Sequence, residues 1–224
     1  MRVTNGAGGP MVVCVDGGQR GEVEGTWSAS LEWLVQRLAP RFPELGFAEV
    51  RYRLKSWRRL ELCVEDARAA VRDAGGTRAV LLGFSMGGAV AITAADEPTV
   101  ERVLGLAPWI PDRLDVSPLR GRRFDVLHGS LDGRVPGLPG VTPRLSRRGF
   151  ERVRDLGAAG EYTLIPGALH AIALRVPGRG PVPLPRAGRW ADLVARQLQT
   201  FVSAEADMSR GQSPDPGGAG ARPA

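Results

Sequence analysis

Short apolar runs alternate with longer amphipathic segments along most of the chain. The apolar runs fall at 11–15, 47–52, 79–83, 103–106, 124–127 and 161–165. Between them, apolar residues recur at helical spacing, as they do in 31–38 and 63–74. This alternation predicts an α/β fold, in which a sheet of about six mostly parallel strands is wrapped by helices on both faces.

Helix boundaries are signalled locally. Ser28 or Ser30 can cap the first helix, and Gly75 follows the second. Thr142 before Pro143 predicts the start of another helix, because proline suits the first helical turn. A last apolar stripe over 190–201 predicts a C-terminal helix.

Composition predicts one folded domain between two irregular ends. The chain has 224 residues, of which 43% are hydrophobic, so it can bury a core of its own. Residues 1–10 are expected to form a flexible leader and residues 11–202 the domain. Residues 203–224 are rich in Gly, Pro, Ser and Ala, and we expect a disordered tail there.

The positive charge does not predict a nucleic-acid partner. The formal net charge is +6, but Lys55 is the only lysine among the 30 basic residues, and the arginines are scattered without a recognisable binding motif. The first six residues lack the apolar core of a signal peptide, and the uncharged stretch 79–95 is shorter than a bilayer span. We therefore expect a cytoplasmic protein with no membrane partner.

The cysteines and histidines do not predict a metal site. Cys14 lies in an expected buried strand and Cys63 in an expected helix, so both are interpreted as small core residues. Two histidines and two dispersed cysteines do not give the spacing of metal ligands. We expect neither a metal nor a cofactor.

The segment Gly83-Phe84-Ser85-Met86-Gly87-Gly88 joins the apolar run 79–82 to the small-residue run 89–95. This pattern predicts a strand, a sharp turn with Ser85 at its apex, and a helix. The flanking glycines remove side chains that would clash where the strand meets the helix. At a helix N-terminus the backbone N–H groups and the dipole favour negative charge, as a tetrahedral oxyanion requires.

Two later segments supply partners for this serine. Asp132 follows the run 124–127 and His170 follows the run 161–165, so the chain order is serine, acid, histidine. Ser85 in its turn resembles the nucleophile elbow of the α/β-hydrolase family, which has this order. The stretch His-Gly-Ser-Leu-Asp-Gly-Arg-Val-Pro over 128–136 is similar to a pattern common around the acid in the dienelactone-hydrolase and carboxylesterase branches.

The resemblance implies a catalytic triad. Ser85 would be the nucleophile, His170 the base and Asp132 the acid that orients the base. The other acids considered, all less favourably placed, are Asp112, Asp115 and Asp125. His128 competes with His170 for the role of base, but the family pattern makes it a loop-packing residue.

The oxyanion would be bound by backbone N–H groups. The resemblance implies Met86 as one donor and either Gly18 or Gln19 as the other. Asp16 stands where the family often has histidine. Because of this departure, the pattern does not decide between Gly18 and Gln19 as the second donor. A dinucleotide-type phosphate loop at 17–21 is a weaker alternative, because the glycine spacing misses G-x-G-x-x-G.

The resemblance covers about residues 11–202 and implies a three-layer, doubly wound sheet with strand order 2-1-3-4-5-6. It would be a reduced α/β-hydrolase fold, because ten residues cannot hold the family's usual first two strands. No cap domain fits between 107 and 123. The site is then expected to be open or shallow, lined by candidates Phe84, Trp109 and Trp27.

These observations favour a serine hydrolase that cleaves a small carboxylic ester or thioester through an acyl-serine intermediate. An acyltransferase using the same acyl-enzyme is an alternative. A non-catalytic binding protein that keeps the fold is another, which the altered Asp16-Gly17 loop would permit. The oligomeric state is left open.

Overall fold

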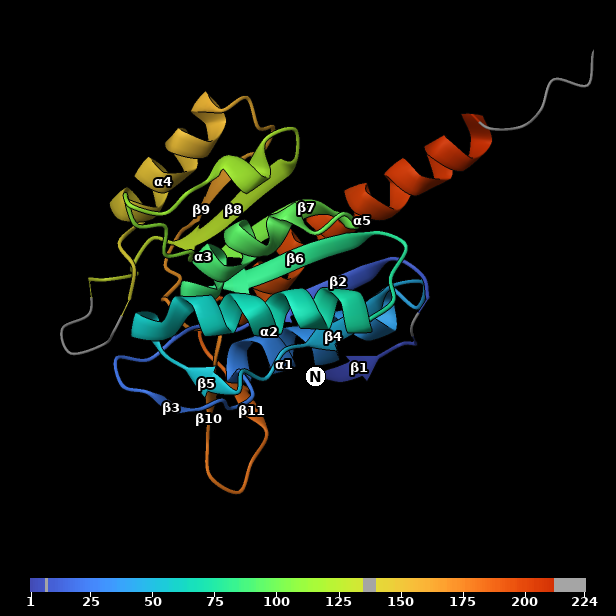
Figure 1. The fold of residues 1–224 in the computed structure, drawn as a ribbon. Helices are drawn as coiled ribbons and strands as arrows, with labels where there is room; N and C mark the ends of the chain where they lie inside the picture. The colour runs from blue at the N-terminus through green and yellow to red at the C-terminus, as the bar shows by residue number, and fades with distance from the viewer. Residues whose placement is uncertain (7, 135–139, 212–224) are drawn as a thin grey trace, which may run out of the picture. The chain divides into compact units, whose positions relative to one another are not determined.

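The fold is described from a computed structural model, which describes residues 1–6, 8–134 and 140–211. Its centre is a seven-stranded sheet (Figure 1). The strands are β1 (Arg2–Thr4), β2 (Met11–Val15), β4 (Gly46–Glu49), β6 (Ala79–Phe84), β7 (Val100–Leu106), β8 (Arg123–Gly129) and β9 (Tyr162–Ile165). Their spatial order is β1-β4-β2-β6-β7-β8-β9. All neighbouring pairs are parallel except β1 with β4.

The order of the six parallel strands confirms the predicted doubly wound topology. Each predicted apolar run corresponds to one of these strands, with shifts of a few residues at the ends. All five residues of β2 are buried, which is expected of a parallel strand covered on both faces. Met11, Val13 and Val15 share one core cluster with apolar side chains of the flanking helices.

The helices are α1 (Ala29–Leu38), α2 (Leu60–Asp73), α3 (Met86–Thr93), α4 (Pro143–Asp155) and α5 (Ala187–Gly211). Single 3-10 turns lie at Ala39–Arg41, Trp57–Arg59, Ala94–Asp96 and Ser117–Leu119. Figure 1 shows α2 and α3 lying across the near face of the sheet. The Ser28 hydroxyl accepts from the Leu31 N–H to cap α1, and the Thr142 hydroxyl caps α4 in the same way.

Two short antiparallel pairs were not predicted. One joins β3 (Val23–Glu24) to β5 (Leu54–Lys55), and the other joins β10 (Ala173–Arg175) to β11 (Pro181–Pro183). The second pair forms a hairpin within the proline-rich stretch that follows His170. Ser30 on α1 holds its start, because the hydroxyl oxygen accepts from the N–H groups of Ile172 and Ala173.

The expectation of a flexible leader over residues 1–10 is wrong for part of that segment. Strand β1 pairs antiparallel with β4 and forms the edge of the sheet. The Arg2 guanidinium also binds both carboxylate oxygens of Glu49, each at 2.7 Å. A short antiparallel edge strand therefore precedes the parallel sheet.

At the other end, α5 continues to Gly211, so residues 203–211 of the expected disordered tail are helical. Residues 212–224 lie outside the described residues. The chain divides into two compact units, Met1–Ala191 and the part from Asp192 onward. The first unit holds the whole sheet and every residue of the site below.

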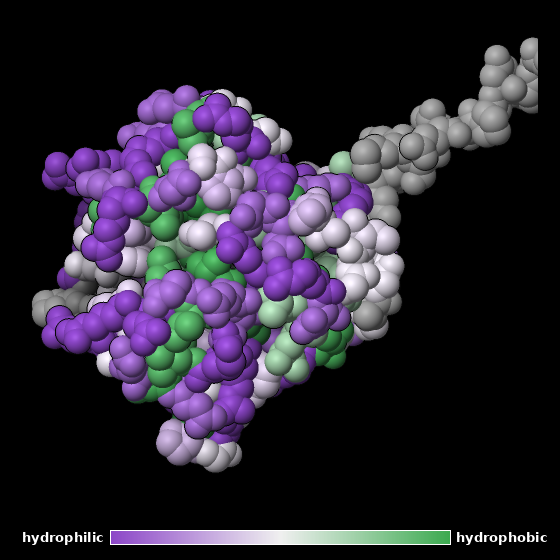
Figure 2. Space-filling view, viewed as in Figure 1, coloured by the Kyte–Doolittle hydropathy of each residue, from purple (hydrophilic) through white to green (hydrophobic). Residues whose placement is uncertain are grey.

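The face of the molecule in Figure 2 is mostly hydrophilic, with hydrophobic side chains gathered in small patches between the polar ones. In the part of the chain that the structure describes, no helix combines the length and hydrophobicity needed to cross a membrane.

Candidate active site

Ser85 occupies a sharp turn between β6 and α3. Its φ and ψ of 55° and −119° lie in a region that side-chain-bearing residues rarely adopt. Its carbonyl oxygen accepts the Trp109 N–H at 2.8 Å, which helps to hold the turn. A Cβ atom at Gly83 would collide with the carbonyl oxygen of Gly87, and one at Gly87 with the carbonyl oxygen of Val15. Glycine at both positions therefore allows α3 to begin directly behind the serine.

His170 joins Ser85 to Asp132 by two hydrogen bonds. Its Nε2 lies 3.0 Å from Ser85 Oγ, and its Nδ1 lies 2.6 Å from Asp132 Oδ2. Asp132 is buried, whereas the His170 side chain keeps 17% of its surface exposed. The Phe84 ring packs against the imidazole at a centroid distance of 5.1 Å. The three side chains proposed from the sequence are thus brought together, at the ends of β6, β8 and β9.

The loops that carry the acid and the histidine are bonded to each other. The Leu131 N–H donates to the Ala168 carbonyl at 2.9 Å, and the Gly167 N–H donates to Ser130 Oγ at 2.9 Å. These bonds fix the spacing of Asp132 and His170 through the backbone as well as through their side chains.

Asp132 has two further partners. Its Oδ1 accepts the Val141 N–H at 3.0 Å, and its Oδ2 lies 3.0 Å from Nε2 of His128. The same Nε2 lies 2.8 Å from the Val141 carbonyl oxygen. Because both neighbours are acceptors, Nε2 of His128 carries a proton. His128 lies one residue before the end of β8 and is fully buried. Its contact with Asp132 was not predicted from the sequence.

The environment keeps Asp132 ionised. Burial by itself would raise the pKa of this carboxyl group, but the hydrogen bonds from His128 and His170 outweigh burial and lower the pKa below its ordinary value. A carboxylate in this position can fix the tautomer of His170 and stabilise an imidazolium.

The loop after β2, residues Asp16–Gln19, lies against Ser85. A Cβ atom at Gly17 would be 3.2 Å from Ser85 Cβ. Among the described residues, the backbone N–H groups of Gly18, Gln19 and Met86 donate to no acceptor. These are the three donors that the sequence analysis proposed for an oxyanion, and all three are available.

Asp16, which stands where the resemblance would place histidine, is buried and fully engaged. Its Oδ1 accepts the Gly17 N–H at 2.7 Å, and its Oδ2 forms an ion pair with Lys55. The Tyr52 hydroxyl donates to the Asp16 carbonyl at 2.8 Å. Burial raises the pKa of Tyr52 well above its ordinary value, so the hydroxyl keeps the proton it donates. Neither partner was predicted from the sequence, although Lys55 is the only lysine in the chain.

A cavity of about 650 Å³ opens beside Ser85. Phe84 and Trp109, both proposed from the sequence, line it. Further apolar side chains line the cavity and were not proposed as cavity residues: Trp57, Met86, Leu131, Val141, Leu145, Leu169, Leu174 and Leu184. An apolar cavity beside Ser85 suits the hydrocarbon part of a small ligand.

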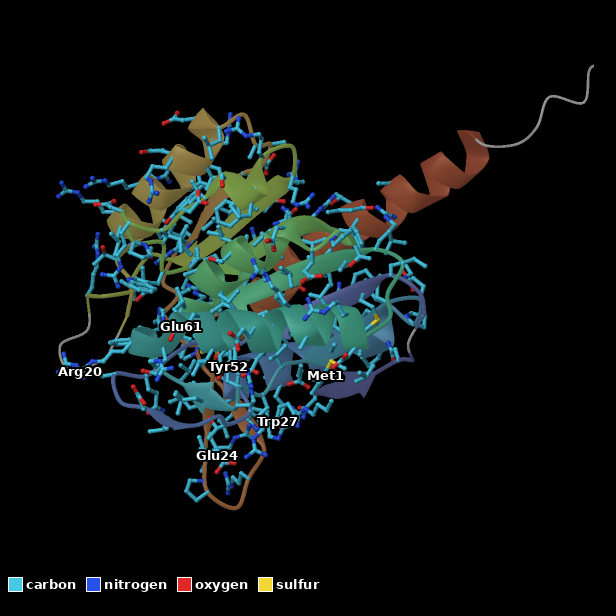
Figure 3. All side chains as sticks on the ribbon, in the orientation of Figure 1. Met1, Arg20, Glu24, Trp27, Tyr52 and Glu61 are labelled. Atoms are coloured by element: carbon cyan, nitrogen blue, oxygen red, sulfur yellow. The ribbon has the colours of Figure 1, made fainter. Side chains whose placement is uncertain are left out.

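Trp27 was proposed to line the site, but it is not among the described residues around the cavity. The Arg2 guanidinium lies over its ring at 4.5 Å from the centroid. Figure 3 labels Trp27 below Met1, on the side of the molecule that carries β1. Trp27 therefore contacts the edge strand β1 through Arg2.

Within the described ranges, no group of three or more His, Cys, Asp and Glu side chains is arranged to hold a metal ion. Cys14 and Cys63 are buried and unpaired, and burial raises the pKa of both thiols. Neither cysteine is among the residues that line the cavity beside Ser85.

Comparison with solved structures shows the fold. The chain is similar to an uncharacterized protein from Bacillus cereus ATCC 10987, with a TM-score of 0.62 and 14% identity over 86% of this chain. It spans 59% of that longer chain. It is also similar to esterase PE8, with a TM-score of 0.61 and 16% identity over 87% of this chain and 93% of that one.

A further similar structure is the monoacylglycerol lipase of Paleococcus ferrophilus, with a TM-score of 0.58 and 15% identity. The match covers 86% of this chain and 96% of the lipase. No family model and no curated protein sequence matches the chain.

Proposed function

We propose that this chain, which has the α/β-hydrolase fold, is a serine hydrolase that cleaves a small carboxylic ester or thioester. The observation that carries the proposal is the unbroken pair of hydrogen bonds from Ser85 Oγ through His170 to Asp132, at 3.0 and 2.6 Å. Both distances are within the range that proton transfer needs. The likeness to an esterase and a monoacylglycerol lipase supports hydrolase chemistry on this fold.

Acylation would begin with attack of Ser85 Oγ on the substrate carbonyl carbon, while His170 Nε2 takes the hydroxyl proton. Asp132 would stabilise the imidazolium that results. The carbonyl oxygen becomes an oxyanion, and the free N–H of Met86 with that of Gly18 or Gln19 would bind it. The tetrahedral intermediate then collapses, and His170 returns the proton to the departing alcohol or thiol.

Deacylation would repeat these steps with water. His170 removes a proton from the water as it attacks the acyl-serine, and the proton passes to Ser85 Oγ when the acid leaves. The apolar cavity would hold the acyl chain throughout. An acceptor alcohol in place of water would give acyl transfer through the same intermediate.

A fluorophosphonate probe tests the proposal directly, because it reacts with an activated serine. We expect the wild type to be labelled and to hydrolyse p-nitrophenyl butyrate, and both properties to disappear in Ser85→Ala. Circular dichroism checks that the variant is folded. A folded wild-type protein that is neither labelled nor active would contradict the proposal and favour the non-catalytic binding protein.

A further inference from the structure

We propose that Lys55 and Tyr52 are positioning residues for the loop Asp16–Gln19, and that they hold its N–H donors where the oxyanion forms. The inference rests on the proposed function and deepens it. In this chain, Asp16 with its partners Lys55 and Tyr52 would take the place of the histidine that the resemblance would put at position 16.

The segment Tyr52–Trp57 contacts this loop at both ends. The Tyr52 hydroxyl donates to the Asp16 carbonyl at 2.8 Å, and Lys55 forms an ion pair with the Asp16 carboxylate. At the far end the Trp57 N–H donates to the Gln19 carbonyl at 3.0 Å. Tyr52 is labelled in Figure 3. The loop is therefore held at its first and last residues by one short stretch of chain.

The middle of the loop is fixed by packing. A Cβ atom at Gly18 would collide with the Trp57 ring and with the Met86 sulfur. Trp57 belongs to the segment Tyr52–Trp57, while Met86 belongs to helix α3, which begins behind Ser85. With carbonyl oxygens bonded at both ends and packing in between, the Gly18 and Gln19 N–H groups are left without an acceptor in the described structure.

The Asp16–Lys55 pair sets the orientation of the Gly17 peptide. The Asp16 and Lys55 side chains are only 4% and 9% exposed, so water solvates the two charges little. The Asp16 carboxylate accepts the Gly17 N–H through the oxygen that Lys55 does not use. Without the lysine, a buried carboxylate would be left unpaired, and it would have to move or take up a proton.

A lysine suits this position better than an arginine. Its ammonium is compact, whereas the planar guanidinium presents a wide fork that needs more room. The 29 arginines that make up the rest of the 30 basic residues do not include this position, which holds the chain's one lysine.

When the N–H donors are displaced from the oxyanion, the enzyme stabilises the transition state less but still binds the substrate in its ground state. Weakening the contacts of Lys55 and Tyr52 with the loop is therefore expected to lower kcat and to leave KM little changed. A residue that only stabilised the fold would lower the amount of active protein and leave kcat per active site unchanged.

The experiment compares Lys55→Met and Tyr52→Phe with a matched control, Arg53→Met. Arg53 lies in the same segment, but its guanidinium pairs with Glu65 and Asp66 on α2. Active sites are counted by stoichiometric labelling with a fluorophosphonate, and kcat is divided by that count. We expect a decrease of about 100-fold in Lys55→Met and about 10-fold in Tyr52→Phe, from the known effect of one oxyanion donor. Arg53→Met should stay within about twofold, the size expected of an exposed ion pair.

A second readout is the affinity for a trifluoromethyl ketone, which forms a tetrahedral adduct with serine. It should weaken in proportion to kcat/KM across the variants. If the wild type is active and kcat per active site is unchanged in both Lys55→Met and Tyr52→Phe, the inference is overturned while the proposed function stands. Tyr52→Phe keeps the shape of the buried ring, so it provides the test if Lys55→Met does not fold. A wild type that neither reacts nor turns over would end the proposed function instead.

Discussion

Nε2 of His128 lies 3.0 Å from Oδ2 of Asp132, the same carboxylate oxygen that binds His170. The acid of the proposed triad is therefore held by two imidazoles, and its other oxygen is held by the Val141 N–H. This arrangement leaves the carboxylate little freedom to rotate, and it lowers the pKa of Asp132 despite burial.

Replacing His128 should weaken catalysis through the acid. His128→Phe removes the donor to Asp132 and leaves the Val141 carbonyl unpaired, so we expect kcat/KM to fall about tenfold, equivalent to ~1.4 kcal/mol. His128→Gln keeps an N–H donor of similar reach and should restore most of the activity. Ester hydrolysis measured against titrated active sites checks this, and equal loss in both variants would contradict the role of the hydrogen bond.

The stability contributed by Asp132 should depend on pH. Its pKa in the folded protein lies below the ordinary value of 3.8, so its contribution is complete above that value and is lost as the pH falls through the folded-state pKa. Urea unfolding of the wild type and Asp132→Asn between about pH 6 and pH 3 checks this. The wild type should lose more unfolding free energy on acidification than the variant does. Parallel losses would show that Asp132 is not the titrating group.

The loop after β2 should not tolerate a side chain at Gly18. Gly18→Ala would push against the Trp57 ring and the Met86 sulfur, so we expect kcat to fall by about 10- to 100-fold through displaced N–H donors. Gly21→Ala is the matched control, because its Cβ would meet only Val23 at an ordinary 3.9 Å. Steady-state kinetics on both variants provides the measurement, and equal rates would argue against close packing at Gly18.

The apolar cavity should select for acyl-chain length. For p-nitrophenyl esters we expect kcat/KM to rise about fourfold for each added methylene, from ~0.8 kcal/mol per buried CH₂, until the cavity is filled. Trp109→Ala, which alters the lining, should flatten this dependence, whereas Trp27→Ala should not. A wild-type series with no dependence on chain length would mean that the acyl group lies elsewhere.

Local pattern was enough to predict the parallel sheet, and the resemblance to the α/β-hydrolase family then pointed to the three triad candidates. The apolar runs mark buried strands, and in a parallel sheet the residues that follow Leu127 and Ile165 must emerge at the same edge as Ser85. Gly83 and Gly87 identified the turn because each permits a close backbone approach that no other residue would.

Contacts between distant segments were not predictable in this way. Strand β1 is short and mostly exposed, so it has no apolar signature, and it forms because the edge of β4 and the carboxylate of Glu49 are available to it. Lys55 and Asp16 are 39 residues apart in sequence. Trp27 carried no local sign of its packing under Arg2. Such pairings arise from tertiary structure, which periodicity does not encode.

The burial of Lys55 also gives the chain a single internal reporter. A protease specific for lysine has one place to cut, and in the native state that place is closed. Cleavage can then occur only when the segment around it opens. The rate at which two fragments appear therefore measures how often this corner of the folded protein comes apart, with no label attached.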